Sequence, residues 1–187
     1  MPPHVLTIGN ISGALSIIFA LSAYAQKERV RFLIINMMAI LAIGVNFYIH
    51  GGYVGAFAEA VMFFVHVTAL MIGKNARKKM SLIAPPLVVS YYIYLHGTKI
   101  GHEIFMSLAI LFFVTGAYQT NMKANKILFM IGLFSLSLYS LATGAYEVMF
   151  ANIIGILVLA FSYVEIGRED KKKKLLPLSR VKTSSRV

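Results

Sequence analysis

The chain has 187 residues, of which 58% are hydrophobic and only 13% charged, and it carries a formal net charge of +11. This composition excludes an ordinary soluble domain and is typical of membrane proteins. Cysteine is absent, which excludes disulfides, thiol catalysis and thiolate metal sites.

Seven apolar segments follow one another along the chain, each close to the roughly 20 residues that cross a bilayer core. Helices are therefore predicted at 5–25, 30–50, 53–73, 80–97, 100–118, 126–143 and 146–166. They use up nearly all of residues 1–167. We expect a single all-α transmembrane domain of seven helices, with no soluble domain, followed by a basic tail at 168–187.

Basic residues gather on one side of this arrangement. All Lys and Arg residues except Lys99 fall in alternate connections or in the tail: Lys27, Arg29, Arg31, Lys74, Arg77, Lys78, Lys79, Lys123, Lys126 and those from Arg168 onward. By the positive-inside rule that side is the cytoplasm, so the N-terminus is predicted outside and the C-terminus inside. The tail is expected to contact anionic lipid. Nucleic-acid binding is not expected, because no aromatic residues interleave the basic run.

An internal repeat appears at an offset of 93 residues, where 8–73 aligns with 101–166 without a gap. Gln26 and Gln119 both end the first helix of their unit, and the outer turns read Gly-Gly-Tyr and Gly-Ala-Tyr. The chain is thus predicted to hold two parallel triple-helix bundles, 5–73 and 100–166, joined by a linker helix at 80–97. Parallel repeats of this kind are a transporter architecture, with the substrate bound near the midplane between the repeats.

The stretch "AYAQKERVRFLIINMMAILAIGVNFYIHGGYVGAFAEAV" resembles the YgjV family of bacterial inner membrane proteins. It combines a basic turn, a helix that ends in aromatic residues, His and Gly, and a third helix rich in small residues. The three-one-three arrangement of helices resembles the SWEET and PQ-loop transporter superfamily. These resemblances imply an inner-membrane location and the transport of a small solute. Where PQ-loop proteins have Pro-Gln, this chain has Ala25-Gln26 and Tyr118-Gln119, so the Gln is kept and the proline is absent.

Glu59 and His66 are ionisable residues inside the third apolar segment. A charged residue at the centre of a membrane helix costs about 2.5–3.5 kcal/mol on insertion scales, so such residues are functional hypotheses by default. Glu59 is expected about 9 Å below the outer turn, at 1.5 Å per residue. His66 follows nearly two turns later, on the same face and about 10 Å away.

The repeat offset pairs Glu59 with Asn152, and Asn46 with Tyr139. In SWEETs an Asn on the third helix of each unit contacts substrate, so the resemblance implies that Glu59 and Asn152 face each other across the central axis. We therefore predict a substrate site formed by Glu59, Asn152, Asn46, Tyr139 and His66. Its ligand is a proton, a cation, or a polyhydroxy or amine-bearing solute, and transport is proton-linked through Glu59.

Structural roles are the alternative for these residues. Glu59 in its protonated form can hydrogen-bond a neighbouring helix, and His66, Asn36 and Asn46 can join helices in the same way. The protein is then a non-transporting membrane scaffold or partner-binding subunit. Neither an enzyme nor a cofactor is predicted. The sequence has no nucleophile in a recognisable motif and no histidines at ligand spacing, and each lysine is assigned to a loop or the tail, which leaves no Schiff-base lysine for retinal.

Overall fold

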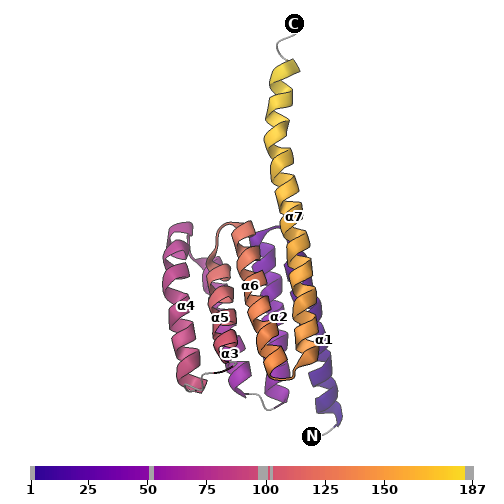
Figure 1. Ribbon diagram of the computed structural model, residues 1–187, viewed down its shortest axis with the longest axis vertical. Coiled ribbons are helices and arrows are strands. Elements are labelled where there is room, and N and C mark those ends of the chain that lie inside the picture. Colours follow the sequence, from indigo (N-terminus) through magenta and orange to yellow (C-terminus); the bar gives the residue numbers. More distant parts are fainter. Residues whose placement is uncertain (1–2, 51–52, 97–100, 102, 184–187) are drawn as a thin grey trace.

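The computed structural model describes residues 3–50, 53–96, 101 and 103–183. Within these residues the chain forms seven helices (Figure 1). They are α1 (Pro3–Ala25), α2 (Arg29–Ile49), α3 (Tyr53–Met71), α4 (Lys74–His96), α5 (Glu103–Tyr118), α6 (Met122–Ala142) and α7 (Tyr146–Thr183). Lys99 and the glycines of the first predicted outer turn, Gly51 and Gly52, lie outside the described residues.

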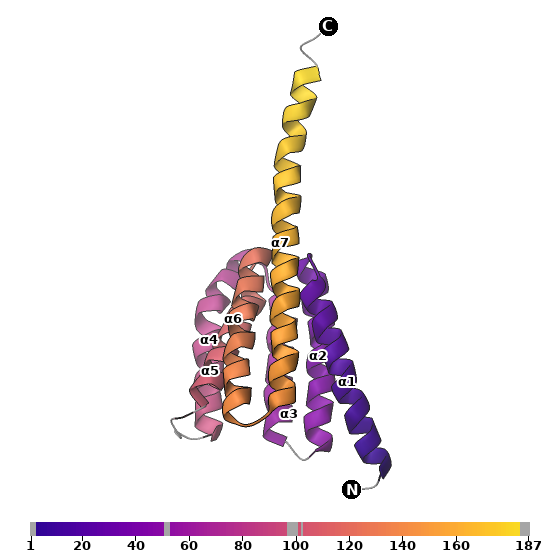
Figure 2. The same ribbon diagram turned by 45° about the vertical axis from the view of Figure 1, so that its right-hand side comes forward.

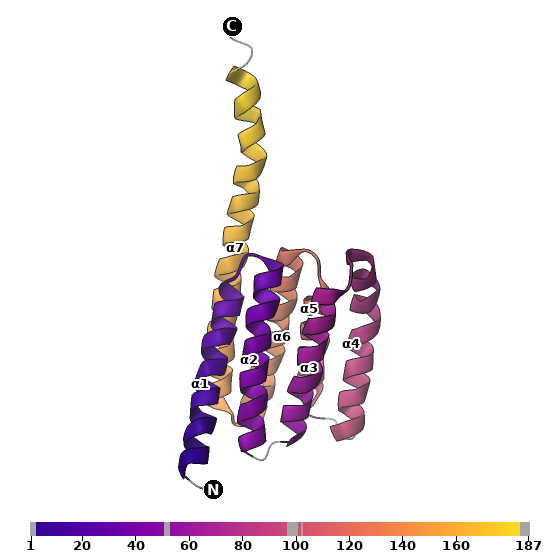
Figure 3. The same ribbon diagram turned by 180° about the vertical axis from the view of Figure 1, so that it is seen from behind.

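Helices that the 93-residue offset relates to each other have related packing neighbours. α2 packs against both α1 and α3, and α6 packs against both α5 and α7. The two units meet where α1 packs against α7 and where α3 packs against α5, two contacts that the offset relates to each other. Figure 3 shows α1, α2, α3 and α4 side by side, with α6 and α7 behind them. α4 packs on α5, at the edge of the bundle.

The apolar core lies at the end of the bundle where α1 ends and α2 begins. Its buried side chains come from both units and include Tyr24, Phe32, Phe129 and Leu159. The ring centroids of Phe32 and Phe129 are 4.8 Å apart and nearly perpendicular, so an edge-to-face contact joins the two units here. Many large apolar side chains on the outer faces of the helices are exposed, as expected where a bundle faces lipid.

Three helical stretches within the described residues are long and apolar enough to cross a membrane: Arg29–Ile49, Met122–Ala142 and Val148–Lys172. The apolar stretches of α1, α3 and α5 are shorter, each between 10 and 17 residues. The protein is therefore all-helical, with three helices that qualify as spans by length and composition alone.

Two helices extend beyond their predicted bounds. α4 begins at Lys74 rather than near residue 80, and α7 continues to Thr183 rather than ending near residue 166. Figure 2 shows the last part of α7 projecting well clear of the other helices. Both extensions are rich in Lys and Arg, which are good helix formers. An apolar segment marks only the part of a helix that suits a membrane. The predicted length is therefore too short where a helix continues beyond the apolar segment.

The assignment of Lys126 to a loop is wrong. α6 begins at Met122 because the side chain of Asn121 caps it, accepting a hydrogen bond of 2.9 Å from the backbone N–H of Lys123. This cap starts the helix about one turn earlier than predicted, so Lys126 lies within α6 and is fully buried. At the other end of α6, Gly144 has a φ of 76°, which is the conformation that its predicted turn requires.

Candidate functional site

Glu59 lines a groove between α2 and α3. Small residues make the space: Gly44 on α2 faces Ala56 and Ala60 on α3. A Cβ atom added at Gly44 would lie only 3.4 Å from the Cβ of Glu59, so the two helices approach closely at this level. The groove has a volume of about 250 Å³, and its lining is completed by Ile40, Leu41, Val45 and Tyr48. We call this space the Glu59 groove.

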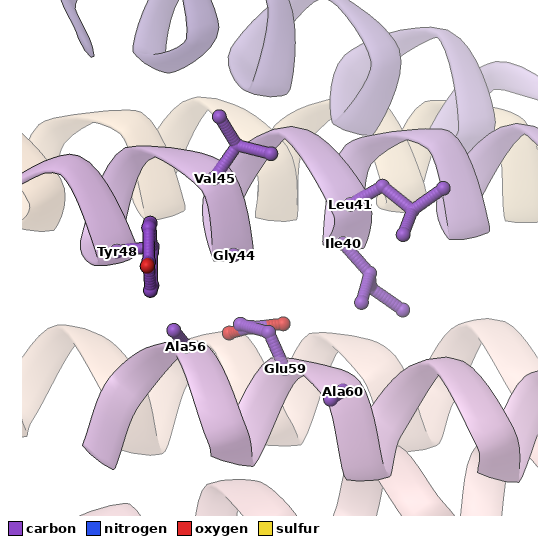
Figure 4. A pocket seen from close by; sticks show the side chains of 8 residues that line it. All are labelled: Ile40, Leu41, Gly44, Val45, Tyr48, Ala56, Glu59 and Ala60. Atoms are coloured by element: carbon purple, nitrogen blue, oxygen red, sulfur yellow. The ribbon is translucent and has the colours of Figure 1, made fainter. Parts of the chain in front are cut away.

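The carboxylate of Glu59 lies among apolar side chains (Figure 4). Glu59 is half-buried, and within the described part of the chain no hydrogen bond or ion pair reaches its carboxylate. Leu41, Val45 and Tyr48 are exposed on the outer face of α2, so the groove opens toward the side of the bundle. An ionisable group at membrane depth without a partner is costly, which is why such a residue is usually functional.

His66 is fully buried and does not line the groove. Its Nδ1 lies 2.9 Å from the carbonyl oxygen of Met62, and its Nε2 lies 2.9 Å from the side-chain amide nitrogen of Asn36. A carbonyl only accepts, so Nδ1 carries the proton and Nε2 accepts from Asn36. The prediction that Asn36 joins two helices is confirmed, because this bond links α2 to α3.

The other predicted substrate residues lie apart from the groove. Asn46 faces α1, where a Cβ at Gly13 would come within 3.1 Å of its amide nitrogen. Tyr139 interacts electrostatically with Tyr92 and Glu103, near the end of the bundle where α5 begins.

Asn152 is buried on α7, and its Nδ2 has no hydrogen-bond partner among the described residues. Of the five predicted substrate residues, all of which the structure describes, only Glu59 lines the groove. A substrate role for the five residues together therefore stays a prediction.

A second space opens where the ends of the two units meet, and we call it the end cavity. It has a volume of about 570 Å³. Its lining comes from the α1–α2 connection, the α5–α6 connection and α7: Ala25, Gln26, Lys27, Glu28, Arg31, Asn121, Met122, Lys123, Ile166, Glu169 and Asp170.

Ion pairs cross the end cavity. Lys27 lies 2.7 Å from Glu169 and 3.2 Å from Glu165, and Lys123 lies 2.7 Å from Asp170. Hydrogen bonds to Glu169 and Glu165 raise the pKa of Lys27 above its ordinary value. The cavity is thus polar, with its positive and negative charges interspersed.

Two basic side chains near the end cavity, those of Lys126 and Arg29, join the units. Both residues were predicted to lie in loops. Nζ of Lys126, on α6, donates a hydrogen bond to the carbonyl oxygen of Tyr24 and lies 4.9 Å from the centroid of the Phe32 ring. Arg29, on α2, donates to the carbonyl oxygens of Ala117 at 2.8 Å and Gln119 at 2.6 Å. A third bond of 3.0 Å reaches the carbonyl oxygen of Ala69 on α3.

The acceptor carbonyls of these two contacts are related by the repeat. Tyr24 and Ala117 are 93 residues apart, at the last turn of the first helix in each unit. In each case the second helix of the opposite unit supplies the cation. The C-terminal end of a helix carries unsatisfied carbonyls and partial negative charge, so a cation there is stabilising. The 93-residue offset relates only the two acceptor carbonyls, because the counterparts of Arg29 and Lys126 are Met122 and Leu33.

The model of the Imp-YgjV family, described as bacterial inner membrane proteins, matches residues 7–170. No curated protein and no solved structure matches the chain significantly.

Proposed function

Since the chain belongs to the Imp-YgjV family of bacterial inner membrane proteins, we propose that it carries a small polar solute across the inner membrane, between its two units. In this proposal it has SWEET-like architecture, with seven spans, the N-terminus outside and the C-terminus inside. Solute movement is coupled to a proton carried by Glu59.

The proposal rests on the contact between the two units, which we call the junction. Repeat-related helix pairs, α1 with α7 and α3 with α5, form this junction, and a polar cavity of about 570 Å³ lies at its end. Parallel repeats with a site between them are a transporter architecture, in which one repeat moves against the other. The end cavity would then be the cytoplasmic vestibule, since the basic connections surround it.

Asn152, which is buried on α7, supports a polar site inside the bundle. Its buried Nδ2 lacks a hydrogen-bond partner among the described residues, and an unpaired buried donor costs about 1–3 kcal/mol. A hydroxyl or carbonyl oxygen of a solute would satisfy this donor. Asn152 is also the repeat counterpart of Glu59, so each unit contributes one polar group from its third helix.

Transport can be tested in liposomes that contain the purified protein. A panel of sugars, polyols, amino acids and amines is applied at equal osmolarity, and light scattering follows the rate at which the vesicles swell. We expect at least one class of solute to enter faster than it enters protein-free vesicles. The proposal fails if no member of the panel enters faster.

One observation favours a second function, that of a membrane scaffold. Directly beneath the end cavity the junction is filled with aromatic rings: the centroid of Tyr24 lies 6.4 Å from that of Phe32 and 6.5 Å from that of Phe129. A transporter must open this contact during its cycle, whereas a scaffold keeps it closed. Absence of solute flux in the same liposomes would favour the scaffold.

A further inference from the structure

We propose that the Glu59 groove binds a small amphiphilic cation, with an ammonium group on an apolar or aromatic body, that enters sideways from the bilayer. This site lies between α2 and α3 of the first unit, not between the two units, so the proposal does not depend on solute transport through the junction.

Charge complementarity identifies the ligand. Among the described residues, Glu59 supplies the one carboxylate that lines the groove, and the others are apolar except for the phenol of Tyr48. Within the described residues its carboxylate has no cationic partner. A cation supplied from outside the chain would remove the cost of that unpaired charge.

Tyr48 adds a second feature suited to a cation. Its ring lines the groove and stands edge to face with the ring of Tyr53, with the centroids 5.5 Å apart. Tyr48 lies near the end of α2 and Tyr53 begins α3. Figure 4 shows the ring of Tyr48 on the α2 side of the groove and Glu59 on the α3 side. Aromatic faces attract quaternary ammonium groups, so Tyr48 and Glu59 together form an anionic and aromatic end of the groove.

Size and access restrict the ligand further. A volume of about 250 Å³ is below the range of about 300–1,000 Å³ that is usual for drug-sized ligands, so the ligand is small. The groove opens past Leu41, Val45 and Ala60, all of which are exposed on the side of the bundle. A ligand with an apolar body can reach it from lipid, whereas a fully hydrated ion or a sugar would have to leave water first.

The test uses the full chain in phosphatidylcholine nanodiscs and phenyltrimethylammonium as the probe. Equilibrium dialysis measures binding, and partition into empty nanodiscs is subtracted. tert-Butylbenzene is the matched neutral probe, because it has the same shape without the charge. Glu28→Gln is the matched control variant, since Glu28 is an exposed carboxylate paired with Arg31 at 3.1 Å, away from the groove.

We expect the wild-type protein to bind the cation at least about tenfold more tightly than the neutral probe. Glu59→Gln should weaken cation binding at least about tenfold, as expected for a charged contact worth about 1.5 kcal/mol or more. Tyr48→Leu should weaken it about two- to fivefold. Glu28→Gln should leave it unchanged.

Ala60→Phe keeps the carboxylate of Glu59 but places a phenyl ring in the groove, from a position that is exposed. It should abolish binding of the cation. This variant keeps the proposal testable if Glu59→Gln fails to fold. Cation binding that is equally tight in Glu59→Gln, or that survives in Ala60→Phe, would overturn the proposal. Equal binding of both probes to the wild-type protein would also overturn it, because the groove would then be an apolar site for any hydrocarbon.

Discussion

Lys126 donates a hydrogen bond from its buried ammonium group to the carbonyl oxygen of Tyr24, and this bond joins the second unit to the first. Arg29 makes a similar contact in the opposite direction, to the carbonyl oxygen of Ala117, which is the repeat counterpart of Tyr24. Each unit thus stabilises the C-terminal end of the other unit's first helix. The contacts lie directly under the end cavity, where a transporter with this architecture would have to open.

Replacing Lys126 with methionine should destabilise the protein. The substitution keeps most of the side-chain volume but leaves the buried carbonyl oxygen of Tyr24 without this donor, which should cost about 1–3 kcal/mol. Thermal unfolding in detergent measures the loss. Lys123→Met is the matched control, three residues earlier on α6: its ion pair with Asp170 is partly exposed, so its loss should cost about 1 kcal/mol or less. Equal stability of the Lys126→Met variant and the wild-type protein would contradict the account.

Substitutions at Asn36 and His66 should have coupled effects on the free energy of unfolding. Asn36→Leu alone leaves Nε2 of the buried imidazole without a donor and should cost about 1–3 kcal/mol. Adding His66→Leu removes both partners of the hydrogen bond. The double variant should therefore lose less free energy of unfolding than the two single variants together, by a coupling energy of about 0.5–3 kcal/mol. Leucine is suitable because the repeat-related positions hold the apolar residues Phe129 and Leu159. Additive losses in a double-mutant cycle would show that the bond contributes nothing.

Lys27 should stabilise the fold in a pH-dependent way. Because hydrogen bonds to Glu169 and Glu165 raise its pKa, its contribution is present below the ordinary lysine pKa of about 10.4 and is lost as the pH rises through the higher folded value. The difference in unfolding temperature between the wild-type protein and Lys27→Gln should therefore be constant from about pH 7 to 9 and shrink above about pH 10.5. It should also shrink in high salt, since these groups are exposed. A difference that is insensitive to both pH and salt would rule out the ion pairs as its cause.

The proposed orientation can be tested because the natural sequence has no cysteine. Thr143, in the α6–α7 turn, is predicted to face the outside, and Thr120, in the α5–α6 connection, the cytoplasm; both are exposed. In cells whose outer membrane has been permeabilised, a membrane-impermeant maleimide should label Thr143→Cys, and it should label Thr120→Cys only after the inner membrane is broken. The reverse pattern would invert the topology, and labelling of both variants on the same side would refute the span count.

Hydropathy was enough to predict seven helices. This prediction depends on apolar segments and on turns, such as the one at Gly144, whose signals are local in the sequence. The beginning of α4 and the end of α7 were missed because helices that leave the membrane need no apolar residues.

The contacts of single side chains were harder to predict. Glu59 and His66 share a helix face by spacing, yet the structure places one in a lateral groove and bonds the other to Asn36. The register and rotation of neighbouring helices decide such contacts, and those depend on packing across the whole bundle. Lys126 illustrates the same limit, because its partner is the carbonyl of Tyr24, 102 residues away.

The central claim, that Glu59 couples a proton to solute movement, is tested most directly in liposomes that contain a pH-sensitive dye. When a transported solute is added outside, the account predicts a change of internal pH in vesicles with the wild-type protein. It predicts no such change with Glu59→Gln, compared with the wild-type protein at equal amounts of folded protein. An unchanged pH signal in the Glu59→Gln vesicles would contradict the account.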